Sequence, residues 1–114
     1  MNLINLTQHN ITVKTSDGII NIKPSGEVAR IVNTQTLSYI ANGIPVVKNS
    51  YTSIVGLPQE KKDTVYIVSG LVRRFLTITE KEGARSDVVA PETEIGCVRN
   101  KDGKTLYVTR LVCN

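Results

Sequence analysis

The sequence is poor in aromatic residues, with no tryptophan, one phenylalanine and four tyrosines among 114 positions. Platforms for single-stranded nucleic acid stack bases on aromatic side chains, so this scarcity disfavours that class. Histidine occurs once and cysteine twice, and no CxxC, HxE or HExxH spacing is present, which argues against a zinc site. No apolar run approaches the roughly 20 residues of a membrane-spanning helix, and no signal peptide is recognisable. We therefore expect a cytoplasmic protein with reduced cysteines and with no metal, cofactor or membrane partner.

β-Branched residues are abundant instead. Isoleucine, valine and threonine number 12, 14 and 12, a third of the chain, and this composition favours strands. The length predicts a single domain, residues 1–114. The net charge is +4 and the isoelectric point is near 9.2, yet no basic run exceeds two residues. Either the surface is evenly basic, or the charge forms a discrete pocket for a small anion.

Short strands separated by turn residues are predicted along most of the chain. Asp17-Gly18 and Asn42-Gly43 supply the positive-φ positions of hairpin turns. Residues 64–68 form a nearly continuous apolar run, typical of a buried central strand. A helix should follow, with Ser69 as its N-cap and Gly83 as its stop. The remaining strands are expected at residues 2–6, 10–14, 19–23, 27–32, 36–41, 44–48, 51–57, 86–90, 95–99 and 105–112.

The predicted fold class is α+β and mainly β. We expect an antiparallel sheet or a small barrel of short strands, with one helix packed on it. Within this arrangement, two arginines stand among the valines of predicted strands. Period-2 alternation places Arg30 on the face of Val28 and Val32, and Arg110 on the face of Val108. A guanidinium stays protonated and is costly to bury alone, so each needs a carboxylate, an edge open to water or an anionic ligand.

Four further residues are candidate ligand contacts, namely Phe75, Arg85, Asp87 and Arg99. Guanidinium forks bind pairs of phosphate oxygens, and their planes stack on bases. The structural alternatives are that Arg85 pairs with Asp87 or another loop carboxylate, and that Arg99 is an ordinary strand-end residue. Phe75 follows Leu71 by four residues on the helix's apolar stripe. It either belongs to the core or caps a pocket and stacks on an adenine.

Catalytic chemistry has little support in the residues. His9 lies between two predicted strands among polar neighbours, which favours a structural role. Both cysteines occur in strand-like sequence far from it, so neither a Cys–His nor a Ser–His–Asp arrangement can be argued. Glu92 and Glu94 lie close together, but they follow Pro91 in a loop expected to be solvated. We therefore expect a binding protein rather than an enzyme, with an unrecognised hydrolase as a disfavoured alternative.

Several short elements resemble those of a family of small proteins from phages and prophages. They are Asn5-Leu6-Thr7-Gln8-His9-Asn10-Ile11-Thr12, Pro24-Ser25-Gly26-Glu27-Val28-Ala29-Arg30, Gly43-Ile44-Pro45-Val46, Val55-Gly56-Leu57-Pro58, Tyr66-Ile67-Val68-Ser69 and Arg85-Ser86-Asp87-Val88-Val89-Ala90-Pro91. Over most of its length the chain resembles the first-described Thoeris anti-defence family. Those proteins sequester cyclic ADP-ribose-type signals made by bacterial TIR-domain enzymes and do not degrade them.

The resemblance implies a nucleotide sponge that works as a homo-oligomer in the host bacterial cytoplasm. It implies a pocket at a subunit interface, with arginine on the phosphates and an aromatic or guanidinium plane on the adenine. It also implies that a second site for cyclic oligonucleotides is possible. Ala29-Arg30 and Arg85-x-Asp87 match the family pattern, whereas the other candidates come from this sequence's own pattern. The predicted ligand-binding set is Arg30, Phe75, Arg85, Asp87, Arg99 and Arg110.

Two other functions remain open. A phage nucleic-acid-binding accessory protein would use the same basic surface on a duplex or a single strand, and its binding would fall steeply with salt. A ligand-free structural or assembly protein would use the arginines only in salt bridges.

Overall fold

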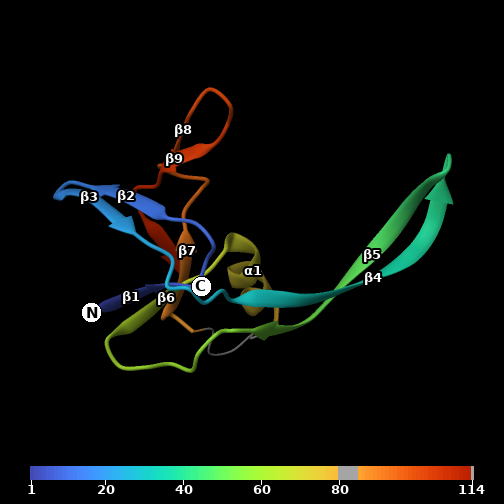
Figure 1. Ribbon diagram of the computed structural model, residues 1–114, viewed down its shortest axis with the longest axis horizontal. Coiled ribbons are helices and arrows are strands. Elements are labelled where there is room, and N and C mark those ends of the chain that lie inside the picture. Colours follow the sequence, from blue (N-terminus) through green and yellow to red (C-terminus); the bar gives the residue numbers. More distant parts are fainter. Residues whose placement is uncertain (80–84, 114) are drawn as a thin grey trace.

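A four-stranded sheet lies at the centre of the molecule (Figure 1). The computed structural model describes residues 1–79 and 85–113. The strands are β1 (Asn2–Asn5), β6 (Thr64–Ile67), β7 (Val88–Pro91) and β10 (Leu111–Cys113), hydrogen-bonded in the order β1-β6-β7-β10. β1, β6 and β7 are parallel, whereas β10 is antiparallel to β7. The carboxyl ends of three strands therefore meet at one edge of the sheet, where β10 begins.

Helix α1 (Gly70–Thr79) lies between β6 and β7 in the chain, because parallel neighbours need a crossover connection. The Oγ of Ser69 accepts a hydrogen bond from the N–H of Val72 at 3.3 Å, which confirms the predicted N-cap. The predicted stop at Gly83 lies outside the described residues. Val72 and Leu76 are buried, but Leu71 is 56% exposed. The prediction that Leu71 belongs to the core-facing stripe is wrong, because the stripe that packs begins one residue later.

Buried side chains form two clusters, which use alternate residues of the central strands. Tyr66 and Val88 belong to the cluster that includes α1, whereas Ile67 and Val89 belong to the other. The first cluster comprises Leu6, Ala29, Tyr66, Val68, Val72, Leu76 and Val88, and the second comprises Ile11, Val13, Ile67, Val89 and Val108. A strand covered on both faces must be apolar throughout. This explains the run at residues 64–68 and confirms the predicted buried central strand.

Three two-stranded hairpins complete the fold. β2 (Ile11–Thr15) and β3 (Gly18–Ile22) pair across a tight turn, and β8 (Val98–Arg99) pairs with β9 (Thr105–Tyr107). β4 (Arg30–Ala41) and β5 (Ile44–Val55) are joined at Asn42-Gly43. Asn42 and Gly43 have φ values of 50° and 81°. The predicted Asn42-Gly43 turn is therefore confirmed. The first hairpin also forms where a turn was predicted, but its loop residues are Ser16 and Asp17, because Gly18, with a φ of 131°, already pairs with Thr15.

We call residues 30–55, the β4–β5 hairpin, the arm, because it extends far from the sheet (Figure 1). Each strand has 12 residues, which span about 40 Å at the usual rise. The Cα radius of gyration is 16.5 Å, whereas a compact chain of this length has about 13 Å. The strands predicted separately at 27–32 and 51–57 are the base of this single long hairpin, where Arg30 pairs with Val55.

The C-terminal part departs most from the predicted strands. The single strand predicted at 105–112 is wrong, because β9 ends at Tyr107 and β10 begins at Leu111 in a different sheet. Val108 forms a bridge with Val13 between them, so Arg110 lies in a connection and not among the valines of one strand. The strand predicted at 95–99 is reduced to β8. The described strands form open sheets rather than a barrel, and the fold class, α+β and mainly β, is confirmed. No helix within the described residues is long and apolar enough to cross a membrane.

The side chain of Asn5 joins β1 to the following loop and to the end of β3. It is only 1% exposed. Its Nδ2 donates to the carbonyls of His9 and Ile22 at 2.8 and 2.9 Å. Its Oδ1 accepts from the backbone N–H and the Oγ1 of Thr7 at 2.9 and 2.6 Å. His9 lies in a loop, as predicted, and contributes its backbone to this network.

Asn5→Ala should lower the free energy of unfolding by about 3 kcal/mol, because it leaves several buried polar groups without partners at 1–3 kcal/mol each. Chemical denaturation would measure the change. The matched control is Asn21→Ala, which removes an exposed asparagine whose Oδ1 accepts from the Oγ1 of Thr12 at 2.8 Å. That variant should stay within about 0.5 kcal/mol of the wild type. Equal losses in the two variants would contradict a special role for Asn5.

Candidate ligand-binding site

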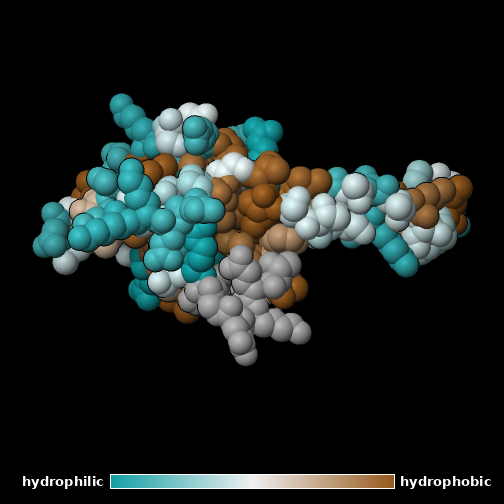
Figure 2. All heavy atoms as spheres, turned by 90° about the horizontal axis from the view of Figure 1, so that it is seen from below, coloured by the Kyte–Doolittle hydropathy of each residue, from teal (hydrophilic) through white to brown (hydrophobic). Residues whose placement is uncertain are grey.

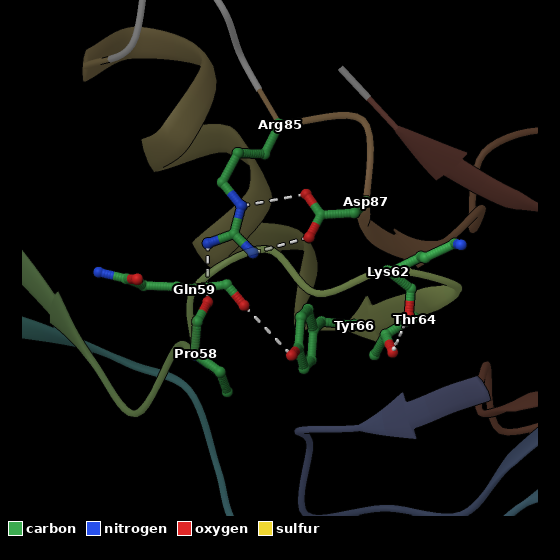
Figure 3. Close-up of polar contacts among 7 residues, drawn as sticks. All are labelled: Pro58, Gln59, Lys62, Thr64, Tyr66, Arg85 and Asp87. Carbon is green, nitrogen blue, oxygen red and sulfur yellow. Dashed lines mark hydrogen bonds and ion pairs between the residues drawn. The ribbon is translucent and has the colours of Figure 1, made fainter. Parts of the chain in front are cut away.

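Arg85 and Asp87 form an ion pair that anchors the loop before β6 (Figure 3). Nε and Nη2 of Arg85 donate to the two carboxylate oxygens of Asp87 at 3.0 and 2.7 Å, and Nη1 donates to the carbonyl of Pro58 at 2.8 Å. The guanidinium lies 5.8 Å from the ring centroid of Tyr66, whose hydroxyl donates to the carbonyl of Gln59 at 3.3 Å. The side chains of Arg85 and Asp87 are only 19% and 11% exposed. All three nitrogens of this guanidinium therefore donate hydrogen bonds within the protein.

Arg99 is exposed and closes the turn between β8 and β9. Its Nη1 donates to the carbonyl of Gly103 and to the Oγ1 of Thr105, both at 3.1 Å, and its Nη2 donates to the carbonyl of Thr93 at 3.4 Å. It also lines a cleft of about 560 Å³, mostly apolar, whose walls include His9 and Tyr107. Here too the guanidinium makes contacts within the protein, both inside its own hairpin and with the loop at Thr93.

Arg30 and Phe75 lie elsewhere. Arg30 is the first residue of β4 at the base of the arm, and it is exposed. Of the three alternatives for this arginine, its position therefore fits a strand edge that is open to water. Phe75 is half-buried on α1. Within the described residues, neither side chain lines this cleft or either of two smaller clefts on the surface. The six predicted ligand residues are therefore not brought together in one protomer.

Arg110 lies at the sheet edge where β6 and β7 end. It directly precedes Leu111, which pairs with Pro91, the last residue of β7. The backbone N–H of Glu92 donates to the carbonyl of Arg110 at 3.1 Å. The Arg110 side chain is exposed, and its Nε donates to the Oγ1 of Thr109 at 3.4 Å. Unlike that of Arg85, its positive charge acts on Glu92, a carboxylate of the loop after β7.

A cleft of about 260 Å³ opens at this edge, beside the first turn of α1. We call it the α1 cleft. It is lined by Gly70, Leu71, Arg73, Arg74, Pro91, Glu92, Thr93, Glu94 and Val112. The first backbone N–H groups of a helix have no intrahelical acceptor and carry partial positive charge. The crevice at the carboxyl ends of parallel strands is also where open α/β sheets bind ligands.

The carboxylates of the α1 cleft are held by neighbouring groups. Oε1 of Glu92 accepts from the backbone N–H of Glu94 at 2.8 Å and of Ile95 at 3.3 Å. These hydrogen bonds, together with the positive charges of Arg73 and Arg110, hold the pKa of the Glu92 carboxyl below its ordinary value. Glu94 pairs with Arg74 at 3.3 Å, and both side chains are largely exposed. Arg73 and Arg74 thus balance the two carboxylates that line the cleft, and Arg110, whose charge acts on Glu92, adds a further positive charge nearby.

The sequence pointed to Arg110 but missed the rest of this cleft. Arg73 and Arg74 were not among the predicted ligand residues, and Glu92 and Glu94 were expected to be solvated. One sequence feature could have predicted the position of this cleft. Ser69 caps a helix that starts directly after a buried strand, so the first turn of the helix lies at the carboxyl end of that strand. What the sequence could not provide was that β10 starts at the same edge.

No protein-family model, curated protein or solved structure matches the chain. Within residues 1–79 and 85–113, no group of three or more histidine, cysteine or acidic side chains is placed to hold a metal ion. The α1 cleft combines guanidinium groups, carboxylates and the first turn of a helix.

Asp87→Ala should lower the free energy of unfolding by about 2 kcal/mol or more, because it leaves a partly buried guanidinium without its carboxylate. Thermal or urea denaturation would measure the loss. The matched control is Glu94→Ala, which removes the carboxylate of the exposed pair with Arg74. Exposed pairs contribute about 0–1 kcal/mol. A larger loss for Glu94→Ala than for Asp87→Ala would contradict the assigned role of the buried pair.

Arg110→Ala should raise the pKa of Glu92 toward its ordinary value, since one of the positive charges that favour the ionised carboxylate is removed. An NMR titration of the side-chain carboxyl carbon would follow it. The stability that Glu92 contributes in the wild type is present above its unfolded pKa and is lost as the pH falls through its folded pKa. Arg30→Ala, at the start of β4, is the control and should leave the Glu92 titration unchanged.

Proposed function

We propose that this protein binds and sequesters a phosphate-bearing cyclic nucleotide signal of the cyclic ADP-ribose type without degrading it, as a phage anti-defence protein. The observation that carries the proposal is the α1 cleft, which is lined by Arg73, Arg74 and the first turn of α1, with the positive charge of Arg110 acting on its residue Glu92. The resemblance to the Thoeris anti-defence family supplies the class of ligand.

The chemistry of the cleft suits a phosphate. Guanidinium groups bind phosphate oxygens through charge-assisted hydrogen bonds, which are roughly twice as strong as neutral ones. The N-terminus of α1 adds backbone N–H donors and a favourable dipole for an anion. Glu92 accepts from two backbone N–H groups, so its charge is partly satisfied within the loop and opposes an incoming anion less.

The volume of the α1 cleft suits only part of the ligand. About 260 Å³ lies just below the 300–1,000 Å³ of typical small-molecule pockets, so the cleft would hold the phosphates and not a whole cyclic nucleotide. The exposed side chain of Leu71 lies on its rim and offers apolar surface to a base or ribose. The remainder of the ligand would extend beyond the rim.

A sponge acts by mass action. It lowers the free signal below the threshold of the responding effector when its concentration exceeds the dissociation constant and its release is slow. No bond of the ligand has to break. Release of intact ligand on denaturation is therefore the property that separates this function from hydrolysis.

The test incubates the purified protein with cyclic ADP-ribose isomers and, separately, with cyclic dinucleotides. Free ligand is measured before and after heat denaturation. Disappearance followed by recovery of unaltered ligand supports the proposal. Recovery of a chemically altered product indicates an enzyme, and absence of binding to every nucleotide overturns the proposal. Salt-sensitive binding of duplex or single-stranded nucleic acid alone would support the accessory-protein alternative.

Arg110→Ala should weaken capture by about 10- to 100-fold, the loss expected for a charged hydrogen bond of 1.5–3 kcal/mol, with a nearly unchanged melting temperature. Isothermal titration calorimetry would measure the affinity. Arg30→Ala is the matched control, since this exposed arginine at the base of the arm does not line the α1 cleft, and it should keep wild-type capture. Loss of capture in Arg99→Ala or Arg30→Ala but not in Arg110→Ala would move the ligand away from the α1 cleft.

A further inference from the structure

Gly96 lies in the connection between β7 and β8, directly against the side chain of Arg110. A β-carbon at this glycine would stand 3.2 Å from Nη2 and 3.5 Å from Nε of Arg110, and it would overlap the Oγ1 of Thr109. The φ of Gly96 is 75°, a left-handed conformation that glycine adopts at little cost. The connection can therefore approach Arg110 this closely only because residue 96 has no side chain.

Arg110 has two further contacts that fix its position. The same Oγ1 of Thr109 accepts a hydrogen bond from its Nε at 3.4 Å, and its backbone carbonyl accepts from the N–H of Glu92 at 3.1 Å. The carboxylate of Glu92 in turn accepts from the N–H groups of Glu94 and Ile95, which shapes the connection just before the glycine. One short connection thus contacts Arg110 at both its backbone and its guanidinium.

From this packing we infer that Gly96 and Thr109, which we call the Arg110 seat, are positioning residues that hold the guanidinium of Arg110 ready for a phosphate. An exposed arginine side chain has many rotamers, and ordering it on binding costs free energy. A guanidinium that is already held loses less of this freedom when the ligand arrives, which is the advantage of preorganisation. The role in capture rests on the proposed function, whereas the seat itself can be tested without a ligand.

Gly103 offers a matched control for the backbone conformation. Its φ is 80°, close to that of Gly96, but a β-carbon there would have no described atom within 4 Å apart from its chain neighbours. An alanine strains the backbone at either position, because a left-handed φ is unfavourable for residues with a side chain. Displacement of Arg110 is expected only from Gly96→Ala. The two variants therefore separate backbone strain from the contact with the guanidinium.

The first test is an NMR titration of the Glu92 carboxyl without ligand, on variants shown to be folded by circular dichroism melts. Gly96→Ala should raise the pKa of Glu92 toward its ordinary value, because the displaced guanidinium of Arg110 stabilises the carboxylate less, while Arg73 still acts on it. Gly103→Ala should leave the titration unchanged. If Gly96→Ala does not fold, Thr109→Ala takes its place, since it removes the acceptor of Nε without adding an atom.

The same titration in an Arg110→Ala background decides how Gly96 acts. Two residues that act through one contact are not additive, so Gly96→Ala should cause no further shift once the guanidinium is gone. A further shift would mean that the alanine disturbs the loop of Glu92 itself, and it would overturn the inference. An equal shift in Gly103→Ala, or no shift in a folded Gly96→Ala, would overturn it as well.

The second test measures capture of cyclic ADP-ribose by isothermal titration calorimetry. Gly96→Ala should weaken capture by about 10-fold, within the loss expected for a charged hydrogen bond, and Gly103→Ala should keep wild-type capture. Gly96→Ala with Thr109→Ala should recover part of the loss, because the overlap with Oγ1 is removed. A folded Gly96→Ala with wild-type capture overturns the inference. A wild type that binds no nucleotide overturns the proposed function instead, and the titrations then decide the Arg110 seat alone.

Discussion

The buried side chain of Asn5 is the contact on which the assembly of the body depends. Its two donors and its acceptor oxygen bind the loop after β1 and the end of β3, while its backbone carbonyl accepts from Ser25 at 2.9 Å. Without this network, the N-terminal strand would have no fixed relation to the β2–β3 hairpin. The next residue, Leu6, donates to the carbonyl of Ile67 and accepts from the N–H of Ala29. The same short segment therefore also sets where the arm begins.

The arginines have different roles in this arrangement. Arg85 lies between a carboxylate, a carbonyl and an aromatic ring, and Arg99 is bound within a turn. Arg110 remains at the edge where strands end and a helix starts, and there its charge acts on Glu92. Arginine is the side chain whose planar fork suits both tasks, joining loops and binding phosphate. Residue type alone could not separate these tasks, because the surroundings of each guanidinium determine its use.

The arm and the α1 cleft lie on different parts of the molecule and place different demands on the sequence. The cleft depends on a strand–helix junction and on charges brought from three elements. The arm depends on apolar side chains that the body leaves exposed, such as Ile40 and Ile44 (Figure 2). In a monomer such residues favour aggregation, since open edges and apolar patches template pairing with other chains.

Local features were predictable from the sequence alone. The fold class, the Asn42-Gly43 turn, the buried strand at 64–68, the Ser69 cap and the loop position of His9 each depend on a few neighbouring residues. Tertiary structure alone decided the break at Val108 that removes Arg110 from a strand. It also decided the merging of predicted short strands into the arm and the meeting of α1, β7 and β10 at one edge. The physical reason is that strand pairing and charge clustering join residues far apart in the chain. The alternation of valines around Arg30 and Arg110 indicated local strand preference and carried no information about which sheet each segment would join.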